Sequence, residues 1–130
     1  MSRPVDRGHW ARAFFTTIDS GDVDRIAEAL TSDVRLTMGN GPPIVGRDAV
    51  REAFVAMNGR IRSVEHAVQG IWSGNDADAE VVSVEATVTY TLPNARRISI
   101  PVTSTLRLEG DRVRDYRIFI DTTPVFGTSP

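Results

Sequence analysis

Few side chains in this sequence can act as nucleophiles, acids or bases near neutral pH. The 130 residues include two histidines and 17 acidic side chains, all 15 basic residues are arginines, and there is no cysteine. Schiff-base chemistry needs lysine, and thiol nucleophiles, disulfides and thiolate metal sites need cysteine, so these are excluded. Proton transfer by carboxylates and imidazole remains, with tyrosine hydroxyls as possible partners.

His66 and Glu85 are the most informative of these groups, and both fall in segments with strand-like composition. Imidazole exchanges protons near neutral pH, and a buried carboxylate must be protonated, paired or hydrogen-bonded. If the two side chains meet, they form an acid–base pair. In the alternative interpretation, Glu85 pairs with an arginine such as Arg107 or Arg117 or faces solvent, and His66 is a packing residue.

No motif indicates a metal or a phosphate group. Asp76, Asp78 and Glu80 lie on a predicted hairpin turn that lacks the glycine and the distal glutamate of a calcium loop. The two histidines are far apart, and no further ligands follow a metal-site spacing. The loop over residues 39–43 contains two prolines, which remove backbone donors, and no lysine follows it. We therefore expect no metal and no cofactor.

The apolar period changes from helical in the first half of the chain to strand-like in the second. Gly21 is a typical helix stop, and Asp22 is a typical N-cap for the next helix. The patterns predict helices over residues 5–20, from 22 to 31–33 and over 47–58, and strands over 34–38, 63–72, 79–92, 96–108 and 112–121. Helices followed by a meander predict one α+β domain over residues 1–126, with a disordered tail over 127–130.

The longest predicted strand has two unlike faces. One face carries Val82, Val84, Ala86, Val88 and Tyr90, and the other carries Ser83, Glu85, Thr87 and Thr89. The apolar face belongs either to the core under the helices or to a homodimer in which two sheets pack face to face.

Three short segments and the order of the elements resemble the nuclear transport factor 2-like superfamily, and within it the SnoaL-like group. The segments are Asp19-Ser20-Gly21-Asp22, residues 45–50 and residues 116–121. The resemblance covers almost the whole chain. It implies a cone of three N-terminal helices packed on a curved antiparallel sheet, an apolar pocket between them, and a homodimer. Members include isomerases, cyclases, dehydratases, epoxide hydrolases and non-catalytic binders.

Two mechanisms known in this superfamily are not supported by the matching positions. Where limonene-epoxide-hydrolase-like members activate water, this sequence has Leu36, Met38, Glu85, Thr87 and Ile118. Where ketosteroid-isomerase-like members have a tyrosine, an aspartate base and an acidic oxyanion donor, it has Phe14, Met38 and Thr103 or Ser104.

Scytalone-dehydratase-like members fit better. Asp19 matches their aspartate at the end of the first helix, and His66 matches one of their two histidines. Glu85 stands at the second histidine, and Ile18 and Met38 stand at the two pocket tyrosines. The alignment also points Glu85 into the pocket.

These observations lead to one function and one alternative. The first is binding of an apolar, oxygenated small molecule, with possible cofactor-free acid–base isomerisation, cyclisation or dehydration. The alternative is a non-catalytic ligand-binding or dimeric accessory domain. The expected catalytic residues are Glu85, His66 and Asp19. The expected ligand-binding residues are Tyr116, Phe14, Met38, Thr87, Ile118 and Trp72.

Composition also limits the classes of binding partner that we expect. The formal net charge is −2, so charge gives no reason to expect nucleic acid or an anionic membrane. No apolar run approaches the length of a membrane span. We expect a soluble, cytoplasmic protein whose partners are a small-molecule ligand and a second copy of itself.

Overall fold

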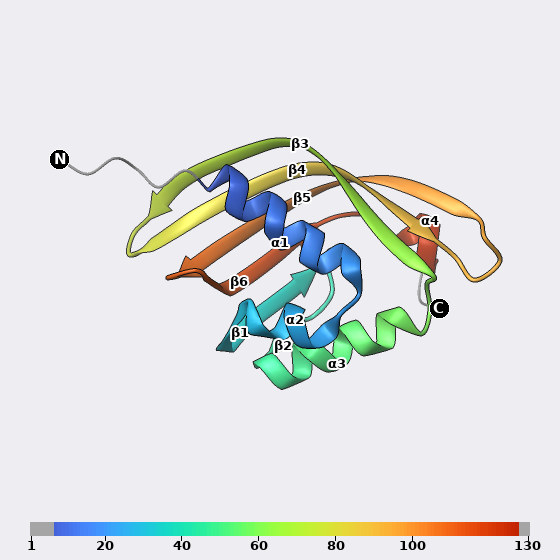
Figure 1. Ribbon diagram of the computed structural model, residues 1–130, viewed down its shortest axis with the longest axis horizontal. Coiled ribbons are helices and arrows are strands. Elements are labelled where there is room, and N and C mark those ends of the chain that lie inside the picture. The colour runs from blue at the N-terminus through green and yellow to red at the C-terminus, as the bar shows by residue number, and fades with distance from the viewer. Residues whose placement is uncertain (1–6, 128–130) are drawn as a thin grey trace.

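The computed structural model describes residues 7–127 and shows a long, curved sheet with helices on its concave face (Figure 1). The elements in chain order are α1 (Gly8–Ser20), α2 (Val23–Glu28), β1 (Leu30–Met38), β2 (Ile44–Val45), α3 (Arg47–Asn58), β3 (Ser63–Asp76), β4 (Ala79–Thr91), β5 (Arg97–Glu109), β6 (Arg112–Phe119) and α4 (Thr123–Phe126). No helix in this part of the chain is long and apolar enough to cross a membrane.

The predicted elements are present, with shifted boundaries. The first helix begins at Gly8, and the expected start at Val5 lies outside the described residues, as does most of the expected disordered tail, residues 128–130. The Asp22 side chain caps α2 by accepting a hydrogen bond from the Arg25 N–H at 3.2 Å. Helix α2 ends earlier than predicted because β1 begins at Leu30. The sequence patterns gave no signal for β2 or α4, which are two and four residues long.

The six strands lie in the order β2-β1-β6-β5-β4-β3. Strands β3 to β6 form an antiparallel meander, and β2 pairs antiparallel with β1. Strands β1 and β6 are parallel, with Leu36 opposite Tyr116. The expected α+β cone is therefore confirmed, but the sheet is mixed and not purely antiparallel. A parallel pair needs a long connection, so no turn motif marks it in the sequence.

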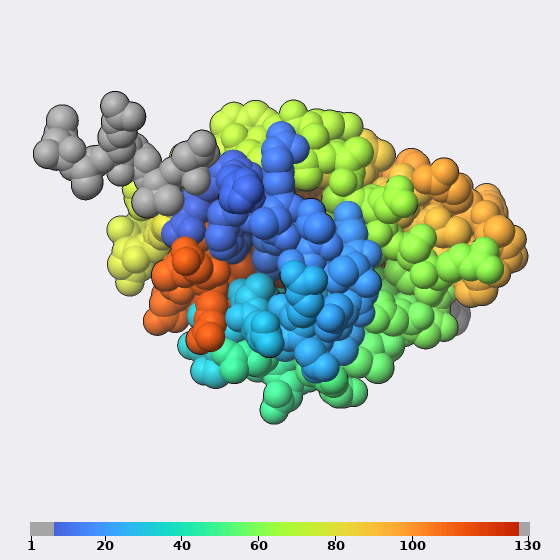
Figure 2. All heavy atoms as spheres, in the orientation of Figure 1, coloured from blue at the N-terminus to red at the C-terminus, as the bar shows by residue number. Residues whose placement is uncertain are grey.

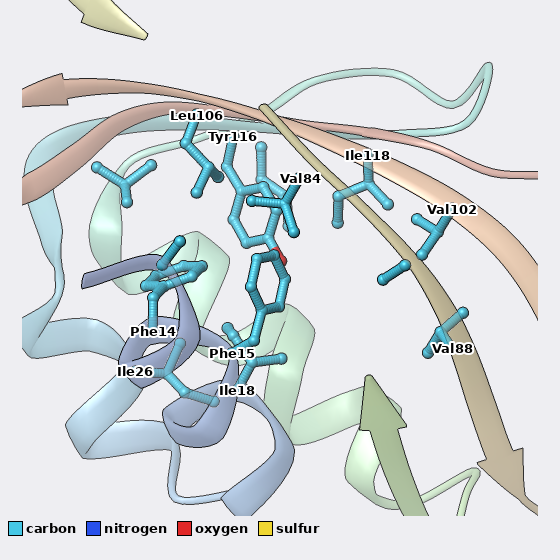
Figure 3. Close-up of a cluster of buried hydrophobic side chains, with 14 of the residues drawn as sticks. Phe14, Phe15, Ile18, Ile26, Val84, Val88, Val102, Leu106, Tyr116 and Ile118 are labelled. Carbon is cyan, nitrogen blue, oxygen red and sulfur yellow. The ribbon is translucent and has the colours of Figure 1, made fainter. Parts of the chain in front are cut away.

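The apolar face of β4 is part of the core. Its members are all buried: Val82, Val84, Ala86, Val88 and Tyr90. Phe14, Phe15 and Ile18 of α1 pack toward this side of the sheet (Figure 3). Helix α1 lies in front of the sheet, and α2 packs beside it against β1 and α3 (Figure 2). Burying a side chain of this size contributes about 1.5–3 kcal/mol, so the core, and not a second copy, accounts for this face.

Arg7, which precedes α1, forms hydrogen bonds with the β3–β4 and β5–β6 hairpins of the sheet. Its guanidinium donates hydrogen bonds to both carboxylate oxygens of Glu80 at 2.7 and 2.8 Å and to Asp111 Oδ1 at 2.8 Å. It also lies over the ring of Trp10. The Arg7 side chain is 9% exposed and that of Glu80 is 28% exposed. The hydrogen bonds from Arg7 lower the pKa of Glu80 below its usual range.

We expect Arg7→Gln to lower the free energy of unfolding by about 1–3 kcal/mol at neutral pH, because charge-assisted hydrogen bonds to a half-buried carboxylate are lost. Since the pKa of Glu80 is lower in the folded state, this contribution is complete above its unfolded pKa and disappears as the pH falls through the folded value. Urea unfolding of both proteins at neutral and acidic pH measures the difference. Arg12→Gln, at an exposed position of the same helix, is the control, and an undiminished difference in acid would contradict the assignment to Glu80.

Candidate active site

A narrow cavity lies between the concave face of the sheet and helices α1 and α3. The volume of this cavity, counted as the space that the centre of a water molecule can occupy, is about 40 Å³. Its lining is mostly apolar, with four polar residues: Asn58, His66, Tyr90 and Tyr116. The other lining residues are Ile18, Met38, Phe54, Met57, Ile61, Val64, Val88, Val102, Ile118 and Ile120. A mostly apolar pocket with a few convergent polar groups is typical of small-molecule sites.

Asp19 and His66 form a hydrogen-bonded pair at this cavity. Asp19 Oδ1 lies 2.6 Å from His66 Nδ1, and Asp19 Oδ2 accepts the His66 backbone N–H at 2.8 Å. The Asp19 side chain is 22% exposed, and the His66 side chain is 9% exposed. Both carboxylate oxygens therefore bind one residue, which fixes the ring relative to the end of α1.

The local fold explains this pairing. Strand β3 is one of the two edge strands of the sheet and, within the described residues, pairs with β4 alone. The His66 N–H faces away from β4, so it has no strand partner, and the carboxylate from the last turn of α1 satisfies it. Val64 and His66 share the inward parity of the strand and line the cavity. The Phe15 ring lies 4.7 Å from the imidazole and packs on it.

This geometry determines which nitrogen of the His66 imidazole carries the hydrogen. An ionised carboxylate can only accept hydrogen bonds, so in the neutral form of the ring Nδ1 carries the hydrogen and Nε2 has the lone pair. Within residues 7–127, no side chain or backbone group is hydrogen-bonded to Nε2. The pair therefore has the arrangement of an oriented general base.

Tyr90 and Tyr116 add two neutral phenols to the lining. Burial raises the pKa of Tyr90 to about 12. Burial also raises the pKa of Tyr116 far above its usual range, and the neighbouring Tyr90 and Asp19 raise it further. Both phenols thus stay protonated at neutral pH. They can donate hydrogen bonds to a ligand oxygen but cannot serve as bases.

A family model of the SnoaL-like domain matches residues 11–116. The chain belongs to the SnoaL-like domain family. This confirms the resemblance drawn from the three sequence segments. Among the curated proteins compared with it, none matches.

Solved structures share the fold of this SnoaL-like domain at low sequence identity. A nuclear transport factor 2-like protein of unknown function from Burkholderia pseudomallei superposes with a TM-score of 0.78 at 19% identity, covering 96% of this chain and 100% of the other. The epoxide hydrolase/cyclase-like enzyme SalBIII gives 0.77 at 24% identity, over 90% and 92% of the two chains. A hypothetical protein with a ketosteroid isomerase-like fold from Catenulispora acidiphila, in complex with trimethylamine, gives a TM-score of 0.80 at 14% identity, over 94% and 92% of the two chains. These likenesses show the fold.

Glu85 does not point into the pocket. It lies on the opposite, outer face of β4 and is exposed, because Val84 and Ala86 on either side of it are buried against the helices. It is therefore separated from His66 by the sheet. The interpretation of Glu85 as a residue on a solvated face is correct, and Arg107 and Arg117 pair with Asp115 instead.

Thr87 and Trp72, which were predicted to bind the ligand, also lie on the outer face. Thr87 accepts a hydrogen bond from Gln69 Nε2 at 2.7 Å there. Trp72 is 55% exposed, and its ring covers Gly70 so closely that a Cβ would lie 2.5 Å from it. A register shift between Val68 and Gly70 moves the strand by one residue, which turns Trp72 outward.

The remaining predicted residues lie on the pocket side of the sheet. Met38, Tyr116 and Ile118 line the cavity. Phe14 is buried and packs edge-on against the Tyr116 ring at 5.5 Å, so it supports the wall without lining it. The predictions missed Asn58, which also donates a hydrogen bond to the Gly21 carbonyl at 3.0 Å. Within residues 7–127, no three acidic or histidine side chains are grouped to hold a metal ion.

Proposed function

We propose that this SnoaL-like domain binds an apolar, oxygenated small molecule and catalyses a cofactor-free proton transfer on it, leading to isomerisation, cyclisation or dehydration. The observation that carries the proposal is the Asp19–His66 pair, whose free Nε2 belongs to a ring that lines an apolar cavity. Two protonated phenols lie in the same lining. The resemblance to SalBIII, an enzyme with a role in pyran-ring formation, agrees with chemistry on such ligands.

The proposed reaction begins with transfer of a proton from the ligand to His66 Nε2, either from carbon next to a carbonyl or from a hydroxyl. Asp19 stabilises the imidazolium through Nδ1, as an oriented carboxylate does for a catalytic histidine. A hydrogen bond from Tyr90 or Tyr116 stabilises the negative charge that develops on the ligand oxygen. The imidazolium then returns the proton to another carbon or to a departing hydroxyl. No cofactor is required by this sequence of steps.

A second candidate function is ligand binding without chemistry. It is favoured by the lining, in which no described residue is an aspartate, glutamate or arginine, so that His66 is its one strong proton acceptor. In that case the Asp19–His66 pair orients a ligand through a single hydrogen bond.

Proton exchange in D₂O separates the two functions. The wild-type protein is incubated with a panel of cyclic ketones, 1,3-diketones and β-hydroxyketones, and ¹H NMR follows loss of the α-proton signals and release of water. We expect exchange above the buffer rate for ligands that also bind. Binding without exchange across the panel would favour the non-catalytic function.

We also propose that the protein forms a homodimer through the outer face of the sheet. This face presents two large exposed rings, Trp72 at 55% and Phe119 at 56% exposure. Phe119 lies on β6 and Trp72 on β3, three strands apart in the sheet order, and exposed aromatic side chains are enriched at interaction surfaces. Sedimentation should give twice the chain mass of 14.3 kDa, and a species of single-chain mass at micromolar concentration would contradict the dimer.

A further inference from the structure

Helix α4 places one aromatic ring at the mouth of the cavity. The Phe126 ring packs edge-on against Tyr90, with the ring centroids 5.9 Å apart. The Arg60 guanidinium carbon lies 4.4 Å from the centroid of the same ring. Tyr90 lines the inner cavity and Phe126 does not, so Phe126 sits just outside it between an aromatic edge and a cation.

A wider outer pocket adjoins the cavity at this point. It measures about 420 Å³ and lies between α3 and the residues around α4. Met38 and Met57 line both spaces, and Phe126 and Arg60 line only the outer one. The inner cavity has room for a few water molecules at about 40 Å³. A ligand larger than that must extend into the outer pocket.

The segment that carries Phe126 is attached to the core through two half-buried side chains, Val125 and Phe126. None of the four residues of α4 is fully buried. Its hydrogen bonds close locally: Phe126 N–H donates to the Thr122 carbonyl, Gly127 N–H donates to the Thr123 carbonyl, and Thr123 N–H donates to Asp121. Segments whose side chains are only half-buried and whose hydrogen bonds are local open at lower free-energy cost than the core.

Arg60 has no competing ion pair. Within residues 7–127, no carboxylate lies within salt-bridge distance of its guanidinium. Its guanidinium lies over the Phe126 ring instead. An arginine guanidinium without an ion pair can form a cation–π contact with the face of an aromatic ring, whether the ring belongs to the protein or to a ligand.

We propose that Phe126 occupies an aromatic-ring subsite between Tyr90 and Arg60, and that a ligand places its own planar aromatic ring there when α4 moves outward. The inference rests on the proposed function, since it concerns the same pocket, and it adds that the ligand carries an aromatic ring beyond the part that meets His66. Phe126 thereby determines whether a ligand can enter the pocket and how long a ligand the pocket can hold.

The test uses N-phenyl-1-naphthylamine, a neutral aromatic probe that fluoresces in apolar surroundings. Phe126→Ala empties the subsite without loss of the core, so the probe should bind about tenfold more tightly than to wild type, because it no longer displaces a stacked ring. Phe126→Leu should give an intermediate affinity. Val45→Ala shortens an exposed apolar side chain on β2, away from both pockets, and should leave probe affinity unchanged.

Arg60→Gln in the Phe126→Ala background should weaken binding of the neutral probe by about two- to fivefold, the size of an exposed cation–π contact. The anionic analogue 8-anilinonaphthalene-1-sulfonate should weaken by a similar factor. If Arg60→Gln weakens the anionic probe alone, the arginine recognises charge and the aromatic subsite is wrong. Unchanged affinity in Phe126→Ala would also overturn it. The probe has no acidic carbon, so its binding is independent of proton exchange at His66 and the two proposals can fail separately.

Discussion

His66→Asn is expected to lower the rate of α-proton exchange by about 10²–10⁴-fold, the usual contribution of a positioned general base. Asparagine can place an amide N–H where Nδ1 stands, so the hydrogen bond to Asp19 can persist, but no atom replaces Nε2. The loss therefore reports the base and not the fold. The rate is measured by ¹H NMR in D₂O with whichever ketone the wild-type protein exchanges fastest.

Glu85→Gln is the matched control for this prediction. Its carboxylate lies on the outer face of β4, across the sheet from the cavity. Exchange in this variant should equal the wild-type rate. Loss of exchange in Glu85→Gln together with full exchange in His66→Asn would reverse the assignment of the base.

Leu106→Ala is expected to lower the free energy of unfolding by about 2–5 kcal/mol, because it leaves a cavity in the core. Leu106 is completely buried on β5, opposite Tyr116 of β6 and Val82 of β4. Figure 3 shows its side chain beside the Tyr116 ring and above Phe14. Three strands and α1 meet at this point, so little local rearrangement can refill the space.

Urea unfolding at a fixed protein concentration, followed by circular dichroism, measures this loss. Val45→Ala removes methyl groups from a side chain that is 60% exposed and should change stability by less than about 0.5 kcal/mol. Equal effects of the two substitutions would mean that the junction of β4, β5 and β6 is not packed as described.

The sequence predicted the faces of β4 correctly through simple alternation, and the error over Glu85 came from the family alignment. Val84 and Ala86 are buried on the inner face of β4. Glu85 lies between them in the sequence, so its side chain points to the outer face. Strand side chains alternate with a period of two, so a shift of one residue in an alignment turns a side chain to the other face. In this strand the local pattern was the better guide to orientation.

Long-range pairings were less predictable than local elements. Nothing in the sequence marks the parallel β1–β6 pair, because its strands are separated by most of the chain. The meeting of Asp19 and His66 depends on α1 crossing the edge strand β3, and only the family resemblance pointed to these two residues together. Phe126 had no sequence signal beyond Pro124, which suits the first turn of a helix.

The central claim is that Asp19 holds His66 with its hydrogen on Nδ1 and its lone pair on Nε2. Long-range ¹H–¹⁵N NMR of the imidazoles tests it most directly, because the chain has only two histidines and His9→Gln leaves one set of signals. In alkaline solution, where imidazole is neutral, we predict a protonated Nδ1 and an unprotonated Nε2 for His66, and loss of this preference in Asp19→Ala. A hydrogen on Nε2 in the wild-type protein would contradict the claim.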